Sequence, residues 1–392
     1  MLSLSALQGS TKLAVTTKER YSEQSEYPNY AWKSSNIRIS PKPSNTGKEI
    51  GIVETPGIKP LGYTKIGDIK VFRLTAQPVE QTLTDGAATH HQLLHAMKSI
   101  LGIKALPTKK KLNGWGYNGS TPGPTIELTV GDKVRVIFRN ELPEPTLIHW
   151  HGLEHPHALD KSSERNPVLP GETHVYEFTA YQEGTYLYHS GCSIAKQNRY
   201  GLVGMVIVHP KQYEEPVDRH IALLVQEWAL NSQTLTPNTA TNQFNWFTLN
   251  GHAAPSIPLI TLRQGERVRL HVGSMALNTY PLFLHGYTWT LVGTEGGPIS
   301  KTAQIKGATL HLLPGTTRTI EFTAWNPGTW PLYALTRHQS LSHMTDIPLE
   351  VTPNGGIFTL LKVVPTDPDA PWAHHSEATT EEGREFPRDL LS

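Results

Sequence analysis

The sequence is almost without cysteine, because Cys192 is the only one among its 392 residues. A single thiol cannot form a disulfide within the chain. It also cannot supply a cysteine-rich zinc module or the thiolates of an iron–sulfur cluster. These classes are excluded, and any metal centre must be built from other side chains.

Charge of one sign and long apolar runs are also missing. Lys and Arg number 35 and Asp and Glu 34, so the formal net charge is +1, which argues against the basic stripe that binds nucleic acid. No apolar run approaches the roughly 18 residues of a membrane span. The most apolar stretch, GLVGMVIV at 201–208, predicts a buried strand. The first residues contain no pattern typical of a signal peptide, so a cytoplasmic location stays open.

The sequence does contain many short alternating strands, arranged as an internal repeat. VLPGETHVYEFTA at 168–180 is echoed by LLPGTTRTIEFTA at 312–324, and GTY at 184–186 by GTW at 328–330. A repeat of about 145 residues with frequent turn signals predicts an all-β protein of two β-sandwiches. The expected organisation is an extended N-terminal arm, a first sandwich, a second sandwich after a polar linker near 211–219, and a polar C-terminal tail: residues 1–65, 66–210, 217–365 and 366–392.

One segment departs from the strand pattern. Residues 84–103 have apolar residues at helical spacing and predict a helix inserted in the first sandwich. His91 and His95 lie four residues apart on one face of it, where two imidazoles can reach a common metal. A surface helix that carries histidines is the simpler interpretation. The role of the histidines at 90–95 is left open.

Histidine is abundant, with 19 residues, and is the commonest metal ligand. In LIHWHG at 147–152, His149 and His151 are two residues apart on a strand and point to the same face. His189 ends a later strand in YLYHSG, and His285 ends a strand of the second repeat in PLFLHGY. One such histidine is usually just hydrogen-bonded, but several at matching strand ends of two repeats predict a metal site.

The runs that carry these histidines resemble the multicopper oxidases. The first repeat, from GWGYNGSTPGPTIELTVGDKVRV through LIHWHG to YLYHSG, resembles the first domain of that family, and the second repeat resembles its copper-bearing last domain. The resemblance implies two cupredoxin-like Greek-key sandwiches, as in two-domain laccases and copper nitrite reductases. It also implies copper, and assembly as a homotrimer with copper at the domain interfaces.

Many of the ligands that the resemblance implies are replaced in this chain. The His-Cys-His run of the family's last domain corresponds to Tyr333, Ala334 and Leu335. The positions of two type 1 histidines correspond to Tyr280 and Gln339, the latter beside His338. Cluster histidines correspond to Phe283 and, in the first repeat, to Gly191.

These replacements remove the electron entry site that the family uses. A blue copper site needs a thiolate and two imidazoles, and Ala334 has no thiol. Cys192 does not follow a cluster histidine directly, and no histidine occurs between 190 and 208, so we expect an ordinary buried thiol. Of the trinuclear ligands implied by the resemblance, those that remain are His149, His151, His189 and His285.

Three functions are compatible with this pattern. The first is a degenerate oxidase whose remaining histidines hold one copper ion, or zinc, for altered redox or other metal-assisted chemistry on a small molecule. The second is a metal-free binding or scaffold protein, in which aromatic replacements fill the former ligand space. The third, a working laccase, is disfavoured by Ala334.

Overall fold

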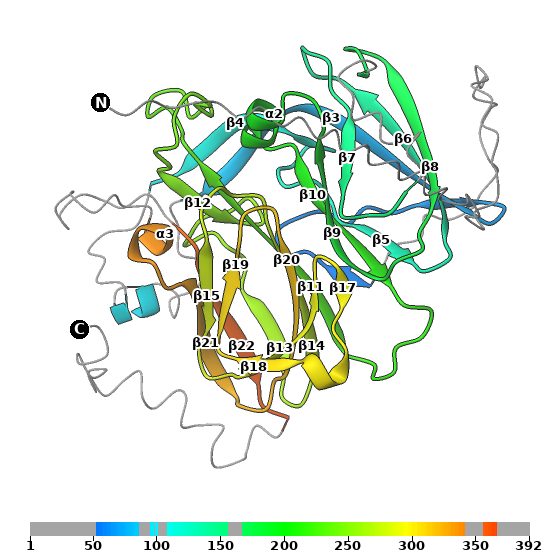
Figure 1. The fold of residues 1–392 in the computed structure, drawn as a ribbon. Helices are drawn as coiled ribbons and strands as arrows, with labels where there is room; N and C mark the ends of the chain where they lie inside the picture. Colours follow the sequence, from blue (N-terminus) through cyan, green and yellow to red (C-terminus); the bar gives the residue numbers. More distant parts are fainter. Residues whose placement is uncertain are drawn as a thin grey trace, which may run out of the picture. The chain divides into compact units, whose positions relative to one another are not determined.

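The computed structural model describes residues 52–85, 95–97, 99–100, 108–155, 167–341 and 356–366. These residues form four β-sheets, which pair into two sandwiches that follow each other along the chain. In Figure 1 the strands of the first sandwich run from blue to green, and those of the second, apart from the blue β1, continue from green to orange-red.

The first sandwich packs a five-stranded sheet against a four-stranded sheet. The five-stranded sheet contains β2 (Thr64–Ile66), β3 (Ile69–Thr84), β4 (Lys110–Tyr117), β6 (Lys133–Asn140) and β8 (Thr173–Thr179). The four-stranded sheet has the order β5 (Ile126–Thr129), β10 (Val203–His209), β9 (Gly184–Ser190), β7 (Ile148–His151), and the short helix α2 (Ile194–Tyr200) connects β9 to β10.

The second sandwich packs an eight-stranded sheet against a five-stranded sheet. The larger sheet contains β1 (Val53–Glu54), β11 (Arg219–Trp228), β12 (Trp246–Leu249), β14 (Arg267–Ser274), β16 (Trp289–Thr294), β17 (Gly297–Pro298), β18 (Ile305–Gly307) and β20 (Thr317–Thr323). The smaller contains β13 (Ile260–Arg263), β22 (Phe358–Val364), β21 (Gly328–Ala334), β15 (Tyr280–Leu284) and β19 (Thr309–Leu312), with η1 (Lys301–Ala303) and α3 (Arg337–Leu341) in connections.

The internal repeat is visible as a repeated strand order. The sequence β5-β10-β9-β7 in the first sandwich matches β13-β22-β21-β15 in the second, and in each case the first pair is parallel and the others antiparallel. Likewise β3-β6-β8 matches β11-β14-β20. The prediction of an all-β protein made of two sandwiches is confirmed.

The two sandwiches also share an apolar contact. All seven residues of β10 are buried, as predicted for the GLVGMVIV stretch. Leu187, Val203 and Met205 on the outer face of the β9–β10 sheet pack with Ala222 and Leu224 of β11. Because the β9–β10 sheet is buried on both faces, β10 carries apolar residues without alternation.

The structure corrects the start of the predicted helix at 84–103. Thr84 is the last residue of β3, paired with Lys110 of β4, so the strand ladder continues where the helix was expected to begin. Residues 95–97 and 99–100 are helical, and the other residues of the predicted helix beyond Asp85, including His91, lie outside the described residues.

Both predicted terminal segments lie largely outside the described residues, which are 52–65 in the arm and Thr366 in the tail. Within the arm, Val53 and Glu54 form β1, which pairs with β11 of the second sandwich, and Ile58 is buried. Among the described residues no helix is long and apolar enough to cross a membrane.

Candidate metal site

Three of the four predicted ligands meet at the end of the first sandwich. His149 and His151 lie on β7, and His189 lies on the neighbouring β9, where the ladder pairs it with His149. Trp150 points to the opposite face and packs in the core against Tyr176 and Phe178. The alternation of β7 therefore places both imidazoles on one face.

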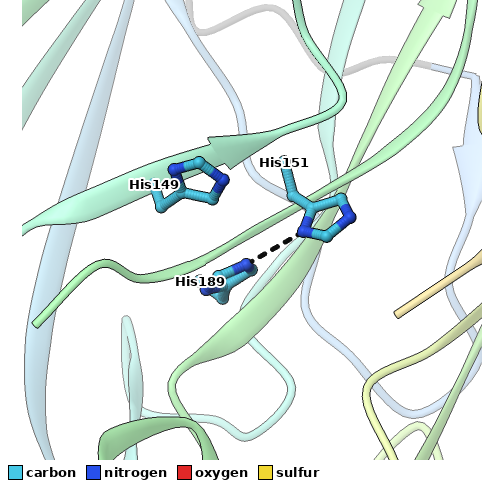
Figure 2. Close-up of side chains that lie close together, drawn as sticks. All are labelled: His149, His151 and His189. Carbon is cyan, nitrogen blue, oxygen red and sulfur yellow. Dashed lines mark hydrogen bonds between the residues drawn. The ribbon is translucent and has the colours of Figure 1, made fainter. Parts of the chain in front are cut away.

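The nitrogens of these three rings lie close together, and one pair has the spacing of two ligands on one metal ion. One ring nitrogen of each residue lies within 4.8 Å of the others, and His151 Nδ1 is 3.2 Å from His189 Nε2. Two nitrogens at about 2.0 Å from a tetrahedral metal are about 3.3 Å apart. Figure 2 shows the three rings gathered together, with the His151–His189 contact dashed. The three residues fit an imidazole-bound copper or zinc ion, and no other group of three such ligands occurs in the described segments.

The surroundings favour the neutral form of two of these imidazoles, His151 and His189. Burial lowers the pKa of His189 to about 4, an effect to which His149 and His151 add. Burial and the neighbouring His149 also lower the pKa of His151, while Glu295 acts in the opposite direction. Because only a neutral imidazole can bind a metal, the lowered pKa values leave His151 and His189 ready to bind at neutral pH.

Glycine 191 cannot be exchanged for a ligand without rebuilding the site. A Cβ atom at this position would lie 2.3 Å from Leu147 Cδ1 and 3.4 Å from His149 Cβ. The space in which a side chain at 191 would begin is thus filled by Leu147.

The second sandwich carries an aromatic pair at the equivalent place. Phe283 on β15 is paired with Tyr333 on β21 in the same ladder position as His149 and His189, and their rings meet edge to face at 5.9 Å. His285 follows Phe283 as His151 follows His149, is half-buried, and stacks obliquely on Phe283. It does not belong to the three-histidine group in the single chain, so its participation stays a prediction.

The positions that the resemblance assigns to type 1 copper do not fit that metal. Tyr280 is fully buried and donates its hydroxyl hydrogen to Glu227 Oε2 at 2.7 Å. Ala334 is fully buried, and Gln339 donates from Nε2 to the Thr279 carbonyl at 3.0 Å. These side chains contain no thiolate and no imidazole.

Loops of the second sandwich approach His151. A Cβ on Gly315 would lie 3.8 Å from His151 Cε1, and a Cβ on Gly152 would lie 3.6 Å from the Glu295 carbonyl oxygen. Gly184 and Gly297 approach so closely that a Cβ on Gly184 would lie 3.1 Å from Gly297 Cα. The two sandwiches therefore meet in this region, and of these three contacts the one between Gly184 and Gly297 leaves the least room for a side chain.

The sequence did not indicate several residues that shape this site. Asn198, Glu227 and Glu295 lie outside the histidine motifs, and nothing in their local pattern connects them with the histidines. Leu147 belongs to the LIHWHG run, but its apolar side chain gave no sign of a role at the site. The alternative helix site is only partly described, since His95 is exposed and His91 lies outside the described residues.

Comparison with known proteins agrees with this fold. Two models described as "Multicopper oxidase" match residues 102–213 and 228–343, together more than half of the chain. The chain belongs to the multicopper oxidase family.

Its relatives include a multicopper oxidase of Staphylococcus aureus, 29% identical over 50% of this chain and 45% of that protein, and an L-ascorbate oxidase of Cucurbita pepo, 40% identical over 29% and 22%. The chain thus spans less than half the length of these relatives. A blue copper oxidase of Nitrosomonas europaea has a TM-score of 0.59 at 23% identity, over 75% of this chain and 85% of that one. A copper nitrite reductase of the same organism has a TM-score of 0.55 at 18% identity, over 75% and 94%. These two structures support the cupredoxin-like fold.

Proposed function

We propose that this chain is a degenerate member of the multicopper oxidases that holds one copper ion between His149, His151 and His189. The observation that carries the proposal is the 3.2 Å separation of His151 Nδ1 and His189 Nε2 within a group of three ring nitrogens. Copper is favoured over zinc because it is the metal that the family binds, although three imidazoles suit both ions.

The absence of a type 1 centre is part of this proposal. The Tyr280–Glu227 hydrogen bond and the buried Ala334 support it, because they replace imidazole and thiolate with groups that cannot form a blue copper site. The Phe283–Tyr333 pair supports loss of the trinuclear cluster, since it fills the place of two imidazoles with carbon and a phenol.

The three histidines would hold the metal from one side and leave its other side open. His189 is buried, whereas His149 and His151 are half-buried, so the site opens toward the β7 histidines. A water molecule or a small-molecule substrate would approach from this open side. Copper bound there would supply one-electron redox chemistry, and the described residues contain no second group of three such ligands that would hold another copper ion to deliver electrons.

Metal content of the purified protein tests the proposal. After copper loading and removal of free metal, about one copper per chain is expected, with no intense blue absorption because no copper–thiolate bond forms. The His149→Ala/His151→Ala double variant should lose most of this copper and keep its far-UV circular dichroism. The His91→Ala/His95→Ala variant is the matched control and should keep its copper.

Two outcomes would overturn the proposal. If the His91→Ala/His95→Ala variant loses the metal, the metal is bound by that pair, and the proposed location at His149, His151 and His189 is wrong. An intense blue band that disappears in Cys192→Ser would instead place a type 1 centre in the first sandwich.

A metal-free scaffold is the second candidate, and the aromatic filling of the second sandwich favours it. Well under one metal ion per chain after loading with copper or zinc would select this function. In a metal-free scaffold protein, His149, His151 and His189 would form a hydrogen-bonded cluster without a metal ion.

A further inference from the structure

A cavity of about 1020 Å³ lies on the outer face of the larger sheet of the second sandwich. Strands β14, β16 and β20 form its floor, and its walls include the start of β9 and the connection between β10 and β11. This volume is close to the upper end of the range of small-molecule sites, about 300–1,000 Å³, and such sites often lie between domains. His149, His151 and His189 are not among its lining residues, so the cavity is distinct from the candidate metal site.

The charged floor of the cavity follows from the alternation of β14. The apolar residues of this strand belong to the core of the second sandwich, so Arg267, Arg269 and His271 share its outer face. The first sandwich covers His271, whose Nδ1 lies 2.7 Å from the hydroxyl oxygen of Thr185. The guanidinium group of Arg269 instead lies 4.4 Å from the ring centre of Tyr213, in the connection between the sandwiches. The arginines are thus enclosed by this connection and line the cavity.

The arginines are held in place by a buried carboxylate. Glu321 on β20 lies opposite Arg269 in the ladder. Arg269 Nε donates to Glu321 Oε1 at 2.6 Å, and Arg267 Nε donates to Glu321 Oε2 at 3.1 Å. Only 6% of the Glu321 side chain and 14% of the Arg269 side chain are exposed. Because buried charges lose their hydration, such pairs add little net stability. A rigid set of donors and acceptors is, however, what a site for a polar ligand requires.

Tyr213 adds a hydrogen-bond acceptor to the wall. Burial raises the pKa of Glu127, but hydrogen bonds from His209 and from the N–H groups of Val53 and Ile52 lower it overall, so this carboxylate is ionised and accepts. His209 Nε2 lies 2.9 Å from Glu127 Oε1 and therefore carries a proton. In the neutral ring His209 Nδ1 then accepts from the Tyr213 hydroxyl. The phenolic oxygen of Tyr213 keeps its lone pairs for a ligand.

The charges that line the cavity are balanced. A bound anion would face carboxylates, and a bound cation would face guanidinium and ammonium groups. A hydroxyl group both donates and accepts, so it matches either kind of wall group. The described lining residues with a carboxylate are Glu183, Glu214, Glu215 and Glu321, and those with a cationic group are Arg267, Arg269, Lys301 and Lys306.

We propose that this cavity binds a neutral, hydroxyl-rich small molecule of the size of a disaccharide. Ligand hydroxyls accept from the arginines and donate to Tyr213 and Glu183, which come from different parts of the chain. The proposal does not depend on the metal site, because the two sites share no described residue.

The test is binding of cellobiose, maltose, sucrose and trehalose to the purified full chain, measured by saturation-transfer NMR and calorimetry. At least one of these sugars should bind at one site per chain with a Kd of about 1 mM or tighter. The Kd should not change when NaCl is raised from about 0.05 to 0.5 M, since a neutral ligand is not screened. Gluconate, which has hydroxyl groups and a negative charge, should bind more weakly. Failure of all four sugars to bind, or preferential binding of gluconate, would overturn the proposal.

A cavity-filling variant locates the bound sugar. Thr290 on β16 lines the cavity and lies opposite Glu321 in the ladder, so Thr290→Trp should remove detectable sugar binding. Thr261→Trp is the matched control, because this exposed threonine of β13 is not a lining residue, and it should keep the binding. Copper content should be the same in both variants. Wild-type sugar affinity in folded Thr290→Trp would place the sugar elsewhere, and the proposal would be wrong.

Tyr213→Phe is the second variant and keeps the ring beside Arg269. Losing one hydrogen bond should weaken sugar binding by about 3- to 10-fold. Tyr181→Phe, at an exposed tyrosine that does not line the cavity, should bind the sugar as the wild type does. An unchanged Kd in Tyr213→Phe would contradict the proposed site.

Discussion

At residue 191 the backbone passes so close to the Leu147 side chain that any larger residue requires Leu147 to move. The resemblance treats this position as a lost ligand, and the structure adds that Leu147 fills the space in which a side chain would begin. The same holds for residue 280, where a tyrosine is tied to a buried carboxylate. Single substitutions back to ligand residues are therefore expected to cost stability before they could restore any copper.

Gly191→Ala tests this crowding with the smallest possible side chain. Its Cβ would lie 2.3 Å from Leu147 Cδ1, so Leu147 must move, and we expect a loss of about 1–3 kcal/mol in the free energy of unfolding. Urea denaturation measures the loss. Gly296→Ala, whose Cβ would have no neighbour nearer than 3.8 Å, is the control. Equal stability of the two variants would show that Leu147 yields without cost.

Tyr280→Phe removes one hydrogen bond from the buried Glu227 carboxylate. Glu227 Oε2 would keep only Asn278 Nδ2, at 2.8 Å, as a side-chain donor. Leaving a buried charged group less satisfied should cost about 1–3 kcal/mol of stability, measured by urea denaturation. Tyr181→Phe, at a largely exposed tyrosine, should change stability little. A neutral Tyr280→Phe would contradict the importance of this bond.

At the scale of elements, α2 fixes the end of β9 that carries His189. The helix has only seven residues, so its own hydrogen bonds contribute little and it depends on tertiary contacts. Gln197 supplies these contacts, because it is buried, accepts from Thr146 Oγ1 at 2.7 Å and from Ser190 Oγ, and donates to Glu144 Oε1 at 2.7 Å. This anchoring also places Asn198, one residue later, whose Nδ2 lies 3.2 Å from His189 Nδ1.

Gln197→Ala should therefore weaken both the fold and the metal site. The buried Thr146 and Ser190 hydroxyls lose a shared acceptor, so we expect a loss of about 2–3 kcal/mol by urea denaturation, together with weaker copper binding. Lys196→Ala is the control on the same helix. It removes an ion pair to Glu144 that is partly exposed and contributes at most about 1 kcal/mol. If the folded Gln197→Ala variant binds copper with unchanged affinity, α2 does not contribute to copper binding at the site.

At the scale of the whole molecule, a buried pair of histidines joins the sandwiches. His220 on β11 and His271 on β14 stack at 5.5 Å, with His220 Nδ1 3.2 Å from His271 Nε2. His271 Nδ1 lies 2.7 Å from the hydroxyl of Thr185 on β9 of the first sandwich. His209 and Tyr213 lie beside the pair. His209 is hydrogen-bonded to Glu127, and the guanidinium group of Arg269 lies over the ring of Tyr213.

This pair should make stability depend on pH. Burial, with smaller effects of His209 and Arg269, lowers the pKa of His220 to about 4; burial and then His220 hold the pKa of His271 well below its usual range. Histidines of the unfolded chain, with a pKa near 6.5, bind more protons below that pH. The free energy of unfolding should thus fall from about pH 6.5 toward pH 4, by up to about 1.4 kcal/mol per pH unit for each histidine.

Urea denaturation at several pH values, with His220→Gln, checks this dependence. The variant should lose one histidine's share of the slope, whereas His311→Gln, at an exposed position, should keep the full slope. A wild-type free energy of unfolding that stays flat between pH 6.5 and 4.5 would contradict the neutral pair.

The expected assembly is a trimer, as in the two-domain relatives that the sequence resembles. In such an assembly we expect His285 of one subunit to lie beside His149, His151 and His189 of a neighbouring subunit. Sedimentation equilibrium should give three times the mass of one chain. A monomer would remove His285 from the site and leave three ligands, because this residue stands apart from them within one chain.

The sequence by itself determined the fold and the approximate location of the site. The repeated PGxTxxxEFTA pattern records two copies of the same strand order, and His149 and His151 share a face because side chains alternate along a strand. Such patterns involve residues that are neighbours in the chain, so the sequence alone is enough to recognise them. The same local patterns predicted the start of the inserted helix wrongly at Thr84, because pairing with β4 continues strand β3 to this residue.

Only the tertiary structure decided which distant residues meet. The ladder between β7 and β9 brought His189 to His149, Leu147 closed the space at Gly191, and Asn198 came to face His189 through α2. These contacts depend on strand register and close packing, in which a shift of one residue moves every side chain to the other face. The sequence therefore supplied the imidazoles, and the packing decided which of them lie close enough to share a metal.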